Sequence, residues 1–81
     1  MWGMAISFDE ARAMVAATQG WDPARWGWEN DEVFVMAYDY GDEPIPAGEP
    51  DLIVDKLTGE SRWVADRSLL PSLRPIGTPP D

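Results

Sequence analysis

The stretch PDLIVDKLTGESRWVAD, residues 50–66, places a charged corner marked by glycine between two apolar runs. This order is typical of a β-hairpin, and it predicts strands at about Asp51–Lys56 and Glu60–Ala65. We expect the aspartate that opens the corner to accept hydrogen bonds from the amides just ahead of it. We expect the glycine to take the positive φ that closes a type I turn with a bulge. The corner is therefore interpreted as a structural turn rather than a binding loop, held by Asp55, Thr58 and Gly59.

An amphipathic helix is predicted near the start of the chain. Ser7 and Glu10 have the S-x-x-E spacing of a capping box, so the helix is expected to begin at Phe8. Gly20 is expected to end it. Residues at steps of three and four form one largely apolar stripe, which predicts the face that packs on the core: Phe8, Ala11, Met14, Val15 and Thr18.

Two further strands are predicted in the middle of the chain. A short strand at Trp26–Glu29 is expected to turn through a two-residue loop, Asn30-Asp31, because both residues tolerate a left-handed backbone. A longer strand is predicted at Glu32–Tyr40. Its side chains are apolar on both faces, which favours a central position in a sheet. The proline-rich and acidic segment 41–50 is predicted to be a loop.

These elements predict an α+β fold, with one N-terminal helix packed on an antiparallel sheet of about four strands. The 81 residues are expected to form a single small domain, 1–81, with an ordered core at about 6–76 and loose ends. In the last segment, four apolar side chains are expected to dock on the core before Gly77 and the following prolines release the chain: Leu69, Leu70, Leu73 and Ile76.

One helix covers only one face of such a sheet, whereas the central strand is apolar on both. The second face therefore needs a cover. The candidates are the C-terminal segment, the tryptophan-rich segment before the first strand, a second copy of the chain in a homodimer, or a different protein. The chain has five tryptophans, a residue type enriched at protein interfaces.

Composition limits the chemistry that the chain can perform. It has no cysteine and no histidine, so thiol chemistry, cysteine-ligated zinc and the commonest acid–base side chain are absent. The acidic clusters at 31–32 and 39–43 lack the spacing of a calcium loop, and no phosphate loop or nucleophile elbow occurs. We therefore expect no catalytic activity, no cofactor and no metal.

The charge indicates the kind of partner. The formal net charge is −9, which opposes binding to nucleic acid or an anionic membrane and attracts a basic protein. No apolar run approaches a membrane span and no signal segment is apparent, so a cytoplasmic location is expected.

The capped helix SFDEARAMVAAT, the strand VFVMAYDY and above all the hairpin LIVDKLTGESRWV resemble the YrhB-type small domains grouped as immunity protein 35. The likeness covers about residues 6–65. It implies a helix on an antiparallel sheet and a non-catalytic cytoplasmic protein. Many members of the family resemble antidotes encoded beside secreted bacterial toxins, and others are described as small chaperone-like factors. The family has no catalytic residues to carry over to this chain.

The expected function is therefore that of an immunity protein, or antitoxin, that binds and occludes a basic bacterial toxin. The alternatives are a chaperone or adaptor that shields the hydrophobic surface of a client, and a self-assembling structural protein. The expected partner-binding residues combine aromatic anchors with acids that steer association: Trp26, Trp28, Asp31, Glu32, Tyr38, Asp39, Tyr40, Asp42 and Glu43.

Overall fold

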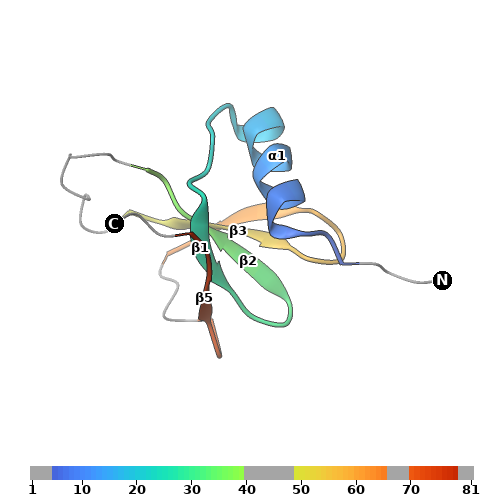
Figure 1. Cartoon of the computed structure of the whole chain (residues 1–81), viewed down its shortest axis with the longest axis vertical. Coiled ribbons are helices and arrows are strands. Elements are labelled where there is room, and N and C mark those ends of the chain that lie inside the picture. Colours follow the sequence, from blue (N-terminus) through green and yellow to red (C-terminus); the bar gives the residue numbers. More distant parts are fainter. Residues whose placement is uncertain (1–4, 40–48, 66–69, 79–81) are drawn as a thin grey trace.

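One helix lies against one face of an antiparallel sheet in the computed structural model, which describes residues 5–39, 49–65 and 70–78 (Figure 1). The strand order is β4-β3-β2-β1-β5 and every pairing is antiparallel. The predicted α+β class is confirmed, with five strands instead of about four. The elements are α1 (Phe8–Gln19), β1 (Trp26–Glu29), β2 (Val33–Met36), β3 (Asp51–Asp55), β4 (Ser61–Val64) and β5 (Arg74–Gly77).

Both ends of α1 form as the sequence predicts. The Glu10 amide donates to Ser7 Oγ over 3.0 Å, and the Ser7 amide donates back to Glu10 Oε1 over 3.1 Å. This capping box satisfies two amides that the helix leaves without partners. Gly20 ends the helix with a left-handed backbone at φ 81°. Ala11 and Val15 are the buried residues of the helix and face the sheet.

The sheet face beneath α1 carries the larger core cluster. Its buried members come from α1, β2 and β3, and Ile6, Phe8, Trp21 and Ile76 pack around them. Phe8 lies over the backbone of Gly27 and its ring centroid is 5.6 Å from that of Phe34. A Cβ atom at position 27 would collide with the Val35 carbonyl oxygen, whereas the Phe8 ring would be at an ordinary contact distance. The glycine is therefore required by the close approach of the β2 backbone.

The opposite face has its own smaller cluster, built on Val33, Val35 and Ile53. Leu70 and Leu73 from the C-terminal segment pack against it, together with Trp28 and Val64. In the part of the chain that the structure describes, this face is therefore covered by the C-terminal segment and by one tryptophan of the same chain. The predicted docking on the core is confirmed for Leu70, Leu73 and Ile76. The fourth predicted residue, Leu69, lies outside the described residues.

The fifth strand was not predicted from the sequence. β5 pairs with β1 along its whole length, from Trp26↔Gly77 to Glu29↔Arg74. The expectation that Gly77 releases the chain is wrong, because Gly77 belongs to β5 and the Thr78 amide donates to the Arg25 carbonyl over 2.9 Å. The four residues of β5 include Pro75 and Gly77, which are rare in strands and therefore hide β5 in the sequence. An edge strand such as β5 nevertheless tolerates a proline.

The central strand and the turn before it differ from the prediction in their bounds. The strand predicted at 32–40 is β2, Val33–Met36, and it is central as expected, with all four residues buried. The turn before it is centred on Asp31 and Glu32 rather than on Asn30-Asp31, because the Asn30 amide donates to the Val33 carbonyl over 3.0 Å. No residue of this turn has a positive φ.

Candidate partner-binding surface

The corner between β3 and β4 is held by hydrogen bonds among its own residues. Asp55 Oδ1 accepts from the amides of Leu57 and Thr58 at 2.8 and 3.0 Å. Gly59, at φ 77°, donates its amide to the Asp55 carbonyl over 2.9 Å. The Thr58 and Leu57 amides stabilise the ionised carboxylate, so they hold the pKa of Asp55 below its ordinary value of 3.8. The Thr58 hydroxyl oxygen accepts from the Glu60 amide over 3.2 Å.

At the same end of the sheet as this corner, Asn30 organises the turn between β1 and β2. Its side-chain oxygen accepts from the amides of Glu32 and Val33 at 2.8 and 2.9 Å. Its side-chain nitrogen donates to the Pro71 carbonyl over 3.1 Å. Asn30 is only 6% exposed, so these bonds replace water that the buried amide group has lost.

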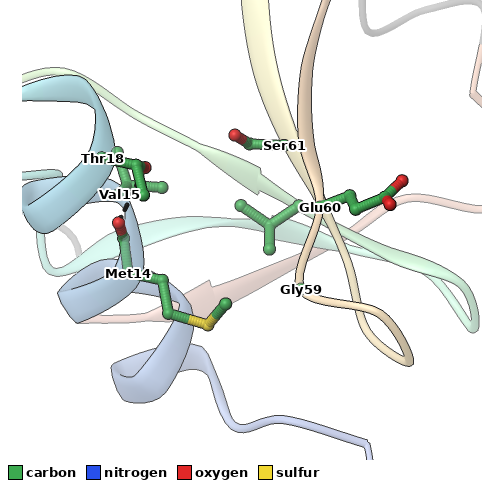
Figure 2. Close-up of a pocket in the computed structure, with 7 residues that line it drawn as sticks. Met14, Val15, Thr18, Gly59, Glu60 and Ser61 are labelled. Atoms are coloured by element: carbon green, nitrogen blue, oxygen red, sulfur yellow. Dashed lines mark hydrogen bonds between the residues drawn. The ribbon is translucent and has the colours of Figure 1, made fainter.

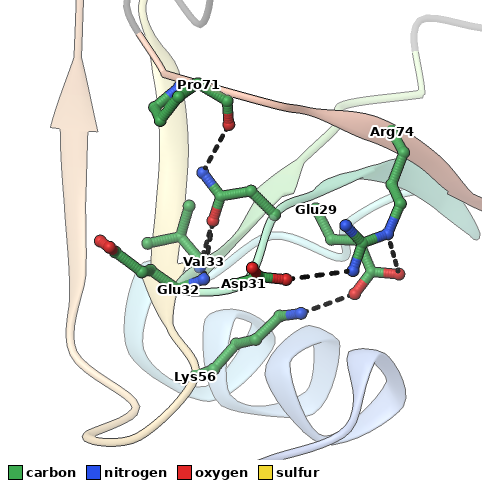
Figure 3. A network of polar contacts seen from close by, with 8 residues as sticks. Glu29, Asp31, Glu32, Val33, Lys56, Pro71 and Arg74 are labelled. Atoms are coloured by element: carbon green, nitrogen blue, oxygen red, sulfur yellow. Dashed lines mark hydrogen bonds and ion pairs between the residues drawn. The ribbon is translucent and has the colours of Figure 1, made fainter.

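An ion-pair network lies beside this turn (Figure 3). Lys56 Nζ is 2.6 Å from Glu29 Oε1 and 4.7 Å from the centre of the Phe34 ring. Arg74 bridges Glu29 and Asp31, with a contact of 3.8 Å to each. Both lysine and glutamate are mostly shielded, which makes their pair stronger than an exposed one.

The predicted partner-binding residues fall into separate regions. Asp31 and Glu32 are exposed in the turn before β2, and Asp31 faces Arg74. Tyr38 and Asp39 are exposed beyond the other end of β2, about 20 Å away along the strand direction. The structure does not bring these two pairs together. Three further predicted residues lie outside the described part of the chain: Tyr40, Asp42 and Glu43.

The two tryptophans of β1 are half-buried. Trp28 is paired with Val35 and packs in the cluster on the face opposite α1. Trp26 alternates with Gly27 in the same strand, so it faces the same side as Trp28. These two predicted residues therefore lie on the other face of the sheet from Tyr38.

Tyr38 belongs to a group of aromatic side chains on the α1 side, which we call the aromatic patch: Trp21, Tyr38 and Trp63. The Trp21 and Tyr38 ring centroids are 5.6 Å apart with the rings tilted by 54°. Trp63 is paired with Leu52 of the α1-side cluster, so its side chain shares that face. Tyr38 and Trp63 are each 52% exposed.

Sequence reasoning did not select Trp21 or Trp63 as partner-binding residues. The available signal was the alternation of side chains along the hairpin, which puts Trp63 on the same face as Leu52 once the register is known. For Trp21 there was no such signal, because its position depends on how the chain leaves α1 after Gly20.

A hollow of about 320 Å³ lies between α1 and the corner of the hairpin (Figure 2). Met14, Val15 and Thr18 form its helix side, and residues 59–61 form its strand side. At its edge the Gln19 side-chain nitrogen donates to Ser61 Oγ over 3.4 Å. Ser61 and Trp63 alternate on one side of β4, so the hollow and the patch share a face of the molecule.

Within the described ranges, no group of three or more His, Cys, Asp or Glu side chains is arranged to hold a metal ion. In the same ranges, no helix has the length and apolar character needed to cross a membrane. Comparison of the chain with protein-family models, curated proteins and solved structures gave no match.

Proposed function

We propose that this protein is a non-catalytic binding domain that attaches to a basic protein, and that its role is that of an antidote which occludes a bacterial toxin. The observation that carries the proposal is the pair of half-exposed aromatic side chains, Tyr38 and Trp63, on one face of a chain with a net charge of −9. Aromatic anchors supply much of the energy of protein interfaces, while charge mainly speeds the encounter.

The supporting structure suits a binding surface that is ready before the partner arrives. Trp63 projects from a hairpin whose corner is fixed by the Asp55 and Gly59 hydrogen bonds. Trp21 is partly buried against the α1-side cluster and supports the Tyr38 ring. Rings held in place before binding lose less conformational entropy when the complex forms.

The choice of a toxin as the partner rests on the resemblance of the helix and the hairpin to immunity protein 35. A chaperone or adaptor is the second candidate, because Leu57 is 69% exposed at the hairpin corner and adds to the apolar surface. The two functions differ in selectivity. An antidote binds one folded partner, whereas a chaperone binds unfolded clients of many sequences.

Co-expression with the product of the neighbouring gene tests the proposal. The expected result is a stable complex with that one protein and restored growth of cells in which the product alone is toxic. Prevention of aggregation of several unrelated heat-denatured proteins, with no complex formed with the neighbour, would favour the chaperone and contradict the antidote. Catalytic turnover of the purified chain on the neighbour would contradict occlusion.

A further inference from the structure

The two edges of the sheet present different hydrogen-bonding groups. β4 is one edge strand and β5 is the other. In an antiparallel pair, residues that exchange hydrogen bonds with the neighbouring strand alternate with residues whose backbone N–H and C=O point to the other side. The register of each edge strand with its inner neighbour therefore shows which backbone groups point outward.

At the β4 edge the outward groups are those of Ser61 and Trp63. The Asp55 amide donates to the Glu60 carbonyl over 2.8 Å, in the same register as the rest of the hairpin. By alternation, Ser61 and Trp63 turn their backbone N–H and C=O away from β3. Among the described residues, no other strand or backbone group bonds to them. Each of the two residues therefore offers one donor and one acceptor at an open edge.

The β5 edge lacks this row of groups. The Thr78 amide donates to the Arg25 carbonyl, so alternation turns the backbones of Pro75 and Gly77 outward. Proline has no N–H to donate, and Gly77 departs from the extended backbone with φ 86°. A proline in this place is a common protection of an edge strand against further pairing. β5 is thus protected in this way, and β4 carries no proline.

The hollow of about 320 Å³ lies beside the open edge, on the α1 side of β4 (Figure 2). Met14, Val15 and Val54 give it an apolar wall, and Ser61 lines it from β4. A residue placed directly opposite Ser61 on an added strand would have its side chain on this same face. Met14 is flexible and adapts to the shape of an inserted group. An apolar side chain therefore suits that position.

The other face of the edge carries two charges. Glu60 and Arg62 alternate with Ser61, and Figure 2 shows the Glu60 carboxylate pointing away from the helix. Both side chains are exposed, and neither forms an ion pair in the part of the chain that the structure describes. Opposite charges on directly facing residues of paired strands are favourable. An added strand is therefore favoured by an acid opposite Arg62 and a base opposite Glu60.

We infer that the β4 edge is a docking site for an extended segment of another protein, which pairs antiparallel with β4 and carries apolar, acidic, apolar and basic side chains in succession. This order follows from the residues that the segment faces: Trp63, Arg62, Ser61 and Glu60. Main-chain hydrogen bonds supply the affinity of such an added strand, and its side chains supply the selectivity. The inference goes beyond the proposed function and does not rest on it.

A second copy of the chain is a poor occupant of this edge. In the register that pairs Ser61 of each copy with Trp63 of the other, the two Arg62 residues lie directly opposite one another. Like charges in that position destabilise the pair. The net charge of −9 on each copy adds to the repulsion.

The probe is the peptide acetyl-Thr-Val-Glu-Val-Lys-Thr-amide, and the control peptide has Glu and Lys exchanged. Neither peptide has a net charge, so the charge of the protein as a whole does not distinguish them. Titration is expected to shift the backbone amide NMR signals of Ser61 and Trp63 and to leave that of Gly77 in place. The control peptide is expected to bind about two- to fivefold more weakly. Shifts confined to β5, no shifts at millimolar peptide, or equal binding of the two peptides would overturn the inference.

Methylated peptides test the main-chain hydrogen bonds without changing the protein. The two valines of the probe face Ser61 and Trp63, so their N–H groups bond to β4, whereas the N–H of the glutamate points away from it. Methyl groups on both valine nitrogens are expected to abolish binding, and a methyl group on the glutamate nitrogen is expected to preserve it. Equal binding by the two methylated peptides would contradict strand addition.

Substitutions in β4 complete the test. Ser61→Pro removes one outward N–H and leaves the hydrogen bonds to β3 in place, so it is expected to weaken binding of the probe about fivefold. Glu60→Lys combined with Arg62→Glu is expected to reverse the preference between the two peptides. This charge exchange decides the matter if Ser61→Pro does not fold. A preference that survives the exchange, or a dimer that Ser61→Pro dissociates in sedimentation experiments, would overturn the inference.

Discussion

The side-chain nitrogen of Asn30 donates a hydrogen bond to the carbonyl oxygen of Pro71, 41 positions further along the chain and 3.1 Å away. This contact ties the turn between β1 and β2 to the segment that leads into β5. The same side chain accepts hydrogen bonds from Glu32 and Val33, so one buried amide group fixes both the turn and the C-terminal segment.

Asn30→Ala is therefore expected to lower the free energy of unfolding by about 1–3 kcal/mol, because three backbone groups lose their partner and one of them, the Val33 amide, is buried. Chemical denaturation monitored by tryptophan fluorescence measures this change. Asp31→Ala, one position further in the same turn, is the control. Its side chain is 97% exposed, and its loss is expected to cost less than about 0.5 kcal/mol. Similar costs for the two variants would contradict this role of Asn30.

Gly59→Ala tests the corner that displays Trp63. The backbone at φ 77° disfavours a side chain, at a cost of about 1–2 kcal/mol. A Cβ atom there would also meet Met14 Cε, the end of a flexible side chain that can move aside at little cost. Gly20→Ala is a matched control, because Gly20 has φ 81° and open space around the new atom. We expect thermal unfolding to show similar losses at Gly59 and Gly20, and no loss at Gly59 would contradict the left-handed backbone at the corner.

Sequence reasoning gave correct expectations where a local rule governs the backbone. The capping box at Ser7 and Glu10, the helix end at Gly20 and the apolar faces of β2 each depend on neighbours within a few residues. It missed β5, because a proline-containing edge strand is recognised only from its pairing with β1. It also grouped Trp28 with Tyr38, although strand alternation places them on opposite faces. The aromatic patch depends on contacts between distant segments, which local patterns do not specify.

The Asp55 carboxylate gives a pH dependence to the hairpin corner. Its pKa in the folded protein is lowered by the Thr58 and Leu57 amides, so folding favours the ionised form. This contribution to stability is present above the unfolded pKa and is lost as the pH falls through the folded pKa. We expect the difference in unfolding free energy between the unsubstituted protein and Asp55→Asn to be constant above about pH 5 and to shrink below it. A difference that does not change with pH would contradict this account.

The capping box offers a separate test of α1, whose C-terminal end adjoins the aromatic patch. Ser7→Ala is expected to destabilise the protein by about 0.5–2 kcal/mol, since the Glu10 amide loses its acceptor. Thermal unfolding measures the loss. Ser7→Asp retains an acceptor at the cap and is expected to recover most of the stability. If Ser7→Asp is as unstable as Ser7→Ala, the side-chain oxygen does not support the helix.

The most direct measurement of the central claim is the kinetics of binding to the neighbouring gene product by stopped-flow fluorescence, at low and high salt. If a basic partner docks on the aromatic patch, added salt should slow association of the unsubstituted protein. Trp63→Ala should raise the dissociation rate about tenfold, and Leu57→Ala should leave it unchanged. A folded Trp63→Ala variant with an unchanged dissociation rate, or association that does not respond to salt, would contradict the claim.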